Sequence, residues 1–252
     1  MTGADTDLAY GGAGSDTLFG STGNDSLYGG AGGDQLQLEA GDGPAFMDGG
    51  SDIDALYLDR SLATVGYKVD LIKGGTLVDG TVFLHFEALN FVGGSGNDTV
   101  LGGFQSDQVF GGAGRDRIVG NTGLDTLEGG AGSDTLVGGD NSDRLTGGAG
   151  VDSFVFDTAP NPDVLDHILD FSAVDDTIRL ALTAFVGMTA GTLAPADFVM
   201  GKVAHDPADR VLYDKATGDI RFDGDGNGAG AAVLFVQVTA GTVLTAADFV
   251  GF

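Results

Sequence analysis

A nine-residue phrase recurs along this chain and constrains its fold more than any other feature. GGAGSDTLF begins at Gly11, and the same pattern returns as GGAGSDTLV at Gly129. A short period kept over many copies predicts a stacked architecture, because each repeat buries its apolar surface only against its neighbours. The copies start at Gly11, Gly20 and Gly29 and then, without a gap, at Gly93, Gly102, Gly111, Gly120, Gly129, Gly138 and Gly147.

Each slot of the repeat carries its own residue type. Positions one, two and four are mostly glycine, which suits backbone that turns tightly or takes a positive φ. Position eight is always apolar, and one inward side chain flanked by two outward ones describes a very short strand. We therefore expect a six-residue turn and a three-residue strand in each copy, with two copies forming a coil of eighteen residues. Position eight holds Leu18, Leu27, Leu36, Val100, Val109, Ile118, Leu127, Leu136, Leu145 and Phe154.

Position six is aspartate in every copy. Alternate turns stack on the same edge of such a solenoid at roughly the 4.8 Å strand spacing. Two carboxylates about 5 Å apart repel each other by about 3 kcal/mol, even at an effective dielectric constant near 20. No series of lysines or arginines occupies a matching phase. Calcium, a hard cation that takes six to eight oxygen ligands, suits carboxylates on glycine-rich turns whose carbonyls are free.

These repeats resemble the RTX, or hemolysin-type calcium-binding, nonapeptide family over residues 2–57 and 93–156. The resemblance implies an all-β fold, a right-handed parallel β-roll (β-helix or solenoid) with calcium-binding turns. It also implies that aspartates at position six and turn carbonyls hold several ions, about five to eight. The implied ligands are Asp7, Asp16, Asp25, Asp34, Asp54, Asp98, Asp107, Asp116, Asp125, Asp134, Asp143 and Asp152, with Gly11, Gly14, Gly29, Gly32, Gly93, Gly96, Gly111, Gly114, Gly129, Gly132, Gly147 and Gly150.

Some turns depart from the family pattern. Gln105 and Asn141 replace glycine at position four, and Asn121 replaces it at position two, so we expect weaker binding at these turns. Residues 38–48 run two residues too long, which leaves Asp42 and Asp48 as doubtful ligands. In the first block we expect the aspartate pair 16/34 on one edge and the pair 7/25 on the other. In the second block we expect the pairs 98/116, 116/134 and 134/152 on one edge and the pairs 107/125 and 125/143 on the other.

The repeats divide the chain into four parts. Residues 1–57 form a first block and 93–156 a second, and residues 58–92 between them are predicted to be a β insertion or enlarged rung. Within this insertion the alternation of apolar residues predicts strands over 65–71, 76–83 and 85–91.

Residues 157–252 are predicted to be a small antiparallel β cap, because a bare last coil would expose apolar rungs and unpaired strand edges. VLDHILDFSAVDDTIRL at 164–180 resembles the segment that follows the repeats in secreted RTX proteases. DKATGD at 214–219 predicts a hairpin, and 231–238 predicts a further strand. In DGDGNGAG, Asp223, Asp225 and Asn227 imitate the start of an EF-hand loop, although a polar hairpin turn is the favoured interpretation because the twelfth position is Leu234.

The final residues, TAADFVGF, place Asp248 before a short apolar tail. This resembles the uncleaved C-terminal signal of proteins exported by type I secretion machinery. An ordinary last strand is the alternative.

Composition excludes several classes of function. The net charge of −26 would repel nucleic acid and anionic lipid. We expect no membrane span and no signal peptide in residues 1–10, and the sequence contains no cysteine. His85, His167 and His205 are scattered, and the nucleophile, zinc-protease and phosphate-loop motifs are missing, so we predict no enzyme activity in this chain.

We therefore expect a calcium-binding RTX module of a secreted, bacterial-type protein that folds on extracellular Ca2+ and supports type I secretion. It would be extracellular or at the cell surface. Two alternatives remain: the folding and secretion tail of an extracellular enzyme (protease, lipase or polysaccharide-modifying), or a structural or adhesive protein of the cell surface. Because the repeats begin close to Met1 in a degenerate turn, an upstream domain of a longer parent protein is also expected.

Overall fold

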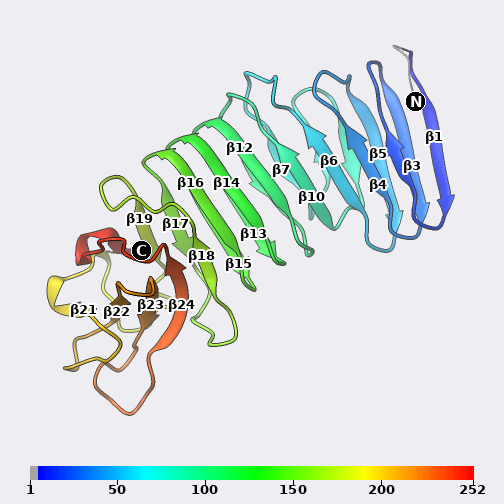
Figure 1. Cartoon of the computed structure of the whole chain (residues 1–252). Coiled ribbons are helices and arrows are strands. Elements are labelled where there is room, and N and C mark those ends of the chain that lie inside the picture. The colour runs from blue at the N-terminus through cyan, green and yellow to red at the C-terminus, as the bar shows by residue number, and fades with distance from the viewer. Residues whose placement is uncertain (1–4) are drawn as a thin grey trace.

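Strands stack one above another along a single long axis (Figure 1). The computed structural model describes residues 5–252, so the first four residues of the predicted first block lie outside the described residues. Apart from two short 3-10 helices, η1 (Pro195–Asp197) and η2 (Ala246–Asp248), the described elements are strands. Most neighbouring strands are parallel, which confirms the expected all-β roll. None of the described helices is long and apolar enough to cross a membrane.

One long sheet runs along one side of the roll and continues into the C-terminal part. It contains, in spatial order, β2 (Thr17–Phe19), β4 (Gln35–Leu38), β6 (Ala55–Asp59), β10 (Ala88–Val92), β12 (Gln108–Gly114), β14 (Thr126–Gly132), β16 (Arg144–Gly150), β18 (Asp166–Ile168), β24 (Val233–Val238), β23 (Asp219–Phe222), β22 (Val211–Asp214) and β21 (Phe198–Met200). We call this the long sheet.

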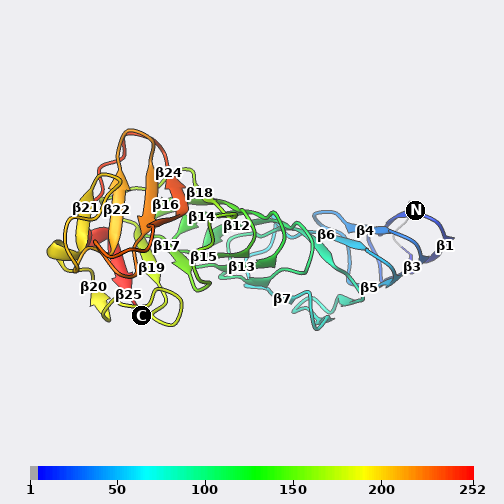
Figure 2. The ribbon, with the colours of Figure 1, turned by 90° about the horizontal axis from the view of Figure 1, so that it is seen from below.

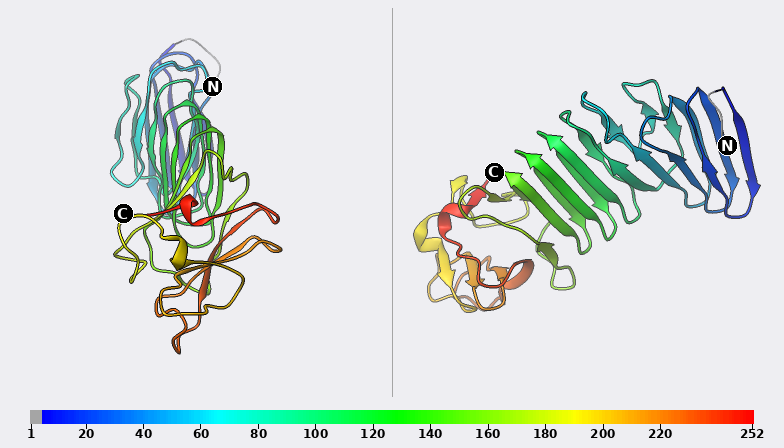
Figure 3. Two further views of the ribbon diagram at one scale, coloured as in Figure 1. Left: turned by 90° about the vertical axis from the view of Figure 1, so that its left-hand side faces the viewer. Right: turned by 45° about the horizontal axis from the view of Figure 1, so that its top comes forward.

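Two shorter sheets form the opposite side. The N-terminal one contains β1 (Leu8–Ala13), β3 (Asp25–Ala31), β5 (Ala45–Ser51), β9 (Val82–Leu84) and β8 (Gly75–Thr76). The other contains β7 (Lys68–Asp70), β11 (Thr99–Leu101), β13 (Arg117–Thr122), β15 (Thr135–Asp140), β17 (Ser153–Phe156), β19 (Thr177–Leu180), β25 (Phe249–Gly251) and β20 (Gly191–Thr192). The end-on view in Figure 3 shows the flattened section that these two sides enclose.

Strand pairing follows the predicted coil length. In the second block Gln108 pairs with Thr126, and Thr126 with Arg144, a step of eighteen residues each time. In the first block the step from Gln35 to Ala55 is twenty residues, because the long turn after β4 adds two. The strands themselves are longer than predicted. Three-residue strands are right for β2 and β11 but wrong for β12, β14 and β16, where pairing continues through the turn glycines.

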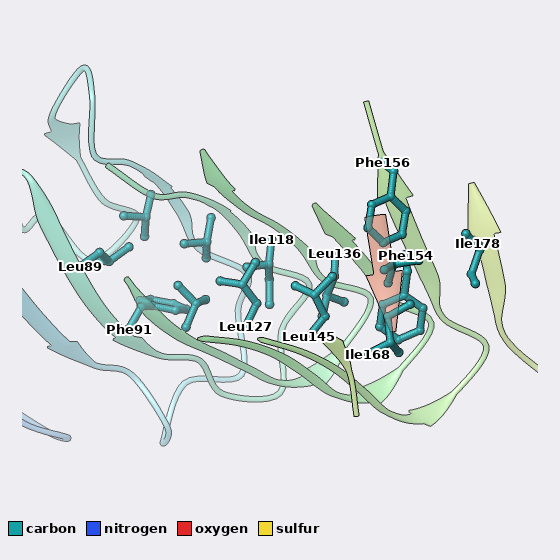
Figure 4. Packing of buried hydrophobic residues seen from close by; sticks show 14 of the residues in the cluster. Leu89, Phe91, Ile118, Leu127, Leu136, Leu145, Phe154, Phe156, Ile168 and Ile178 are labelled. Carbon is teal, nitrogen blue, oxygen red and sulfur yellow. The ribbon is translucent and has the colours of Figure 1, made fainter. Parts of the chain in front are cut away.

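The core is a single row of apolar side chains between the two sides (Figure 4). The residues at position eight are buried in every copy except the first, where Leu18 is half-buried. The row continues beyond the repeats with Ile168 and Ile178. Each coil therefore contributes only two such rungs, and burial of apolar surface is spread thinly along the molecule.

The insertion joins the blocks through one enlarged coil. The segment predicted as one strand over 76–83 is instead a hairpin, since β8 and β9 pair antiparallel around a turn at 77–81. β9 closes the first block on β5, whereas β7 opens the second block against β11. The repeat frame shifts by two residues at β10. Leu89 lies opposite Leu56 of β6, whereas Phe91, two residues later, lies opposite Val109 of β12.

The C-terminal part covers the end of the roll (Figure 2). β18 and β19 are still parallel coils, and β24 and β25 pair on them in the same direction. The expected hairpin is formed by β22 and β23, and β24 adds an antiparallel neighbour. The last strand, β25, belongs to the cap, and its Phe249 is fully buried.

Candidate metal centres along the turns

The turn aspartates lie on two edges of the roll, as the repeat predicts. Those that precede strands of the long sheet are Asp16, Asp34, Asp54, Asp107, Asp125 and Asp143, and those on the opposite edge are Asp7, Asp25, Asp98, Asp116, Asp134 and Asp152. All except Asp7 and Asp16 are buried. Buried carboxylates need partners, because an unpaired charge away from water is costly.

One oxygen of each of these carboxylates from Asp25 onward accepts a hydrogen bond from the preceding coil. The Oδ1 atom of Asp116 accepts the backbone N–H of Asp98 at 2.7 Å, and that of Asp134 accepts the N–H of Asp116 at 2.8 Å. The structure repeats this contact in all seven expected same-edge pairs and also between Asp34 and Asp54. These hydrogen bonds fix each side chain against the neighbouring turn without using its second oxygen.

That second oxygen is buried without a hydrogen-bond partner in nine of the described turns. The Oδ2 atoms concerned belong to Asp16, Asp34, Asp54, Asp98, Asp116, Asp125, Asp134, Asp143 and Asp152. Buried polar atoms in folded proteins almost always have a partner. A periodic row of negatively charged oxygens that lack one therefore indicates a row of positions for a cation.

The glycine at position one leaves room beside each of these oxygens. A methyl group placed on Gly111 would lie 2.5 Å from Asp116 Oδ2 and 2.6 Å from the carbonyl oxygen of Gly129 in the next coil. A methyl group on Gly129 would meet Asp134 Oδ2 at 2.5 Å and the Gly147 carbonyl at 2.7 Å. The same space, between an unpartnered Oδ2 and the next coil's carbonyl, occurs at Asp16, Asp34, Asp54, Asp98, Asp116, Asp125 and Asp134.

Two predicted ligands lie in turns that are closed by their own backbone. Asp25 Oδ2 accepts the N–H of Ser21 at 2.7 Å, and Asp107 Oδ2 accepts the N–H of Gly103 at 2.7 Å. In both turns the residue at position two lies outside the left-handed region, a feature shared by Gly94 in the turn of Asp98, where Oδ2 nevertheless has no hydrogen-bond partner. We call the row of stacked turn aspartates on each edge a ladder. On this edge the ladder of the first block ends at Asp25, because Ala45 occupies the matching position one coil later.

The glycines at position four have a different role from those at position one. Their nearest neighbours are position-four carbonyls one coil earlier, as at Gly114, where a methyl group would lie 2.5 Å from the Gly96 oxygen. Gly14, Gly32, Gly114, Gly132 and Gly150 take positive φ values. Asn121 and Asn141, which replace turn glycines, also do so, with φ of 74° and 76°. Asparagine tolerates this region better than most residues, which explains why these turns keep their course.

Burial perturbs the acidity of the ladder. It raises the pKa of Asp116, Asp125, Asp152 and Asp54 to about 6, with the charge of neighbouring carboxylates adding to the effect at Asp116, Asp152 and Asp54. It raises the pKa of Asp107 to about 7 and that of Asp143 to about 8, the latter helped by the charge of Asp166. In the absence of a cation these carboxyls therefore keep a proton up to a higher pH than an ordinary aspartate does.

The ladder extends to residues that the repeat does not include. Asp166 Oδ1 accepts the N–H of Asp143 at 2.9 Å, and Asp176 Oδ1 accepts that of Asp152 at 3.0 Å. Asp170 accepts from the N–H groups of Gly147 and Gly148. The sequence carries a signal for the first two, since Ile168 and Ile178 follow them by two positions, as the apolar residue follows the aspartate in each repeat.

The doubtful candidates lie away from the ladder. Asp42 accepts the N–H of Glu39 at 2.8 Å within its own turn, and Asp48 pairs with His85 Nδ1 at 2.7 Å. The Asp223–Asn227 loop joins β23 and β24, and Asp225 there accepts the N–H of Gly230 at 3.0 Å. That loop has the hairpin position favoured from the sequence.

The donors present suit calcium. Within residues 5–252 no three acidic, histidine or cysteine side chains converge on one point, so an ion in a turn would take carboxylate oxygens from few side chains and the remainder from backbone carbonyls. Such an all-oxygen, carbonyl-rich set is typical of calcium sites. The buried Oδ2 atoms and the position-one glycine spaces fit such an ion.

Comparison with known proteins gives a family for the repeats. The model of the RTX calcium-binding nonapeptide repeat matches in four copies, over residues 1–36, 10–43, 90–118 and 119–154. No curated protein matches the chain.

Two solved structures resemble it. The extracellular lipase LipA from Serratia marcescens is 19% identical, with a TM-score of 0.36 over 98% of this chain and 38% of the lipase. The AlgE6R3 subunit of the Azotobacter vinelandii mannuronan C5-epimerase is 26% identical, with a TM-score of 0.33 over 70% of this chain and 82% of that subunit. The chain thus spans well under half of the lipase's length. Residues 1–43 and 90–154 therefore carry RTX calcium-binding nonapeptide repeats.

Proposed function

We propose that this chain is a folding module whose repeats assemble around calcium ions outside the cell. The observation that carries the proposal is the row of buried Oδ2 atoms without partners, each beside a glycine-lined space and a carbonyl of the next coil. The position-six aspartates and the position-one carbonyls would hold the ions. The seven turns that combine both features lie within the five to eight ions expected from the sequence.

Each part of a turn has a task in this scheme. The Oδ1 hydrogen bond sets the carboxylate at the right height between two coils. Glycine at position one keeps the space beside Oδ2 open, and the left-handed glycines at positions two and four bend the backbone around it. Calcium, when bound, supplies the positive charge that offsets the buried carboxylates. At a concentration of about 100 times its dissociation constant, an ion adds about 2.7 kcal/mol to stability at each site.

Without that charge the roll is poorly supported. Each nonapeptide buries one main apolar side chain, which contributes about 1.5–3 kcal/mol. Ordering the backbone costs about 1–2 kcal/mol for each residue. The repeats would therefore stay unfolded where calcium is scarce and fold where it is plentiful.

Export by type I secretion machinery follows from the same reasoning. An unfolded, acidic chain can pass through a channel, and calcium outside would fold it and oppose its return. The tail that resembles an export signal ends in β25, where Phe249 is buried. Such a signal would be accessible only before the cap folds, which supports export ahead of folding. The chain would then act in the extracellular space or at the cell surface, by itself or behind an upstream domain.

A calcium titration followed by circular dichroism tests the proposal. We expect a chelator-treated sample to show mostly coil and to gain β structure as calcium is added. Magnesium at the same concentrations serves as the control and should leave the spectrum unchanged, since its small, rigid octahedral shell does not suit a carbonyl-rich turn. A sample that keeps its full β signal after removal of calcium would refute calcium-dependent folding.

A further inference from the structure

On one edge of the first block the ladder of aspartates gives way to uncharged residues where the insertion joins. Ala45 lies opposite Asp25, and Thr81, which directly precedes β9, takes the next place. The N–H of Ala45 donates to the Thr81 hydroxyl at 3.4 Å, as a backbone N–H elsewhere donates to a turn aspartate. On the opposite edge the carboxylates continue, since Glu87 Oε2 accepts the N–H of Asp54 at 2.9 Å. The break in charge is therefore confined to one edge.

The second block begins on that edge with a tyrosine. The N–H of Tyr67 donates to Asp98 Oδ1 at 2.6 Å, which places Tyr67 one step before the first aspartate of the second block. The register of the following residues agrees, because Lys68 lies opposite Thr99. The edge between the two blocks thus has three successive ladder places that hold no carboxylate.

A buried arginine lies at this break in the ladder. Arg60 is 6% exposed and is the only buried basic side chain within residues 5–252. Its Nη2 donates to the Thr81 hydroxyl at 3.2 Å, its Nε to Asp79 Oδ2 at 2.8 Å and its Nη1 to the carbonyl oxygen of Asp59 at 3.0 Å. The guanidinium carbon lies 5.9 Å from the centre of the Tyr67 ring. The protein therefore brings its own positive charge to the places that lack a carboxylate.

Asp79 balances that charge and, unlike most turn aspartates, has both oxygens hydrogen-bonded. Its Oδ2 accepts from Arg60 and also from the Tyr67 hydroxyl at 3.2 Å, and its Oδ1 accepts the N–H of Thr81 at 2.9 Å. In nine turns of the roll, by contrast, the Oδ2 atom is buried without a partner. A buried carboxylate that is paired and fully hydrogen-bonded needs no added cation.

The insertion also buries more apolar side chains than the repeats do. Nine are buried over residues 58–92, whereas four are buried over residues 93–127, a stretch of the same length. The nine are Leu58, Tyr67, Val69, Leu71, Leu77, Phe83, Phe86, Leu89 and Phe91, and the four are Val100, Val109, Ile118 and Leu127. Because burial of apolar surface is the main favourable term in folding, the insertion depends less on bound ions than the repeats do.

We propose that Arg60 takes the place of a metal ion at this level of the roll, so that the insertion is a rung whose folding does not require calcium. The inference rests on the proposed function, since it sets the insertion apart from repeats that fold on calcium. The insertion lies between the two blocks (Figure 1) and outlasts both when calcium is withdrawn. The repeats on either side then refold onto it, because in a stack of coils each one forms against a neighbour already in place.

Hydrogen exchange of the full wild-type chain at graded free calcium tests the inference. We expect β8 and β9 to keep slow exchange down to a calcium concentration about tenfold lower than β14 and β16 do, since a more stable segment needs less ligand to remain folded. If β8 and β9 lose protection at the same concentration as β14 and β16, or at a higher one, the inference is wrong while the proposed function stands. Full protection of β14 and β16 in chelator would overturn both.

Two substitutions separate the charge of Arg60 from its packing. Arg60→Met removes the charge and keeps an apolar side chain, so exchange in β8 and β9 should become as dependent on calcium as exchange in β14 and β16. Arg60→Lys keeps the charge, and its calcium midpoint should stay closer to the wild type than to Arg60→Met.

The matched control is Arg117→Met, because Arg117 is exposed on β13 opposite Thr99 and Thr135. This control should leave the calcium midpoint of β8 and β9 at the wild-type value. A wild-type midpoint in Arg60→Met, or equal midpoints in Arg60→Met and Arg60→Lys, would contradict the assigned role of the charge.

Discussion

At the scale of single residues, the two oxygens of a turn aspartate have unequal surroundings. In Asp116, Oδ1 is hydrogen-bonded to the backbone of the coil before it, and Oδ2 is buried without a partner. The hydrogen bond of the first oxygen joins successive coils. The second makes the regular coil costly unless a cation is near, because the penalty for a buried unpaired charge is large. The dependence on metal thus arises from one atom in each turn.

The raised pKa values predict how pH acts on the metal-free chain. Unfolded aspartates titrate near 3.8, whereas the folded pKa values of Asp116, Asp107 and Asp143 are raised to about 6, 7 and 8. The folded form therefore binds protons more tightly, so its stability is greatest below pH 3.8 and is lost as pH rises from about 6 to 8. With a chelator present, we expect β structure to appear on acidification from pH 8 to 4.

Circular dichroism at several pH values in chelator checks this expectation. A metal-free chain that becomes less ordered as the pH falls would contradict it. With calcium in excess we expect the opposite effect at acidic pH. β structure should then be lost as the pH falls, since protons compete with the ion for the same carboxylates.

The sequence predicted which residues form the ladders better than it predicted how each carboxylate is hydrogen-bonded. Position six and position eight follow from the period alone, and both lie where expected. The closure of Asp25 by Ser21 and of Asp107 by Gly103 was not predicted. Both turns depart from the glycine pattern, at Ser21 and at Gln105, but such a departure does not specify which N–H turns toward the carboxylate.

At the scale of elements, each turn is part of the strand system. The pairing of Gly112 with Gly130 and of Ala113 with Ala131 carries the ladder of hydrogen bonds around the bend. For this reason the six-residue turn and three-residue strand predicted from the pattern merge into strands of up to seven residues. Any group that disturbs a turn therefore also disturbs the strands above and below it.

Gly129→Ala should show this coupling. The added methyl group would lie 2.5 Å from Asp134 Oδ2 and 2.7 Å from the Gly147 carbonyl, in the space assigned to an ion. We expect a higher calcium midpoint and a loss of about 1–3 kcal/mol in the free energy of unfolding, a typical cost of overpacking. Gly224→Ala is the control, since its methyl group would meet only ordinary contacts at 3.7 Å or more. Urea unfolding at fixed calcium measures both, and equal values for the two variants would refute the assignment.

Elements outside the period were harder to predict. Asp166, Asp176 and Glu87 continue the ladders, but they lie 23, 24 and 33 residues after their partners instead of eighteen. The hairpin of β8 and β9 was predicted as one strand, because Thr76–Phe83 alternates well enough, although Asp79-Gly80 within it is the two-residue signal typical of a hairpin turn. Where spacing varies, register depends on packing, which a pattern of single residues does not report.

At the scale of the whole molecule, the roll is long and thin (Figures 1 and 3). A net charge of −26 along such a body favours expansion whenever the cations are removed. The two states should therefore differ greatly in size.

Small-angle X-ray scattering can measure the difference. An unfolded chain of this length has a radius of gyration of about 55 Å, and a compact globule about 18 Å. We expect a value near the first in chelator and, on addition of calcium, a contraction to a value that stays above the second because the roll is elongated. Magnesium should cause little contraction. A radius that is the same with and without calcium would contradict the prediction.

The length of the insertion leaves the nine-residue period of the repeats unchanged on either side of it. Residues 49–57, GGSDIDALY, fill one nine-residue frame with Asp54 at its sixth position, and Gly93 begins another, so joining them directly would leave the phase intact. Asp54 and Asp107 are now 53 positions apart, and removing the 35 residues 58–92 would place them eighteen apart on the same edge. Ala45 and Asp98 would acquire the same spacing. A single deletion would thus convert the interrupted solenoid into an uninterrupted one, and a single acquisition would do the reverse, without a compensating change in any coil; a lineage could change from one form to the other in one genetic event.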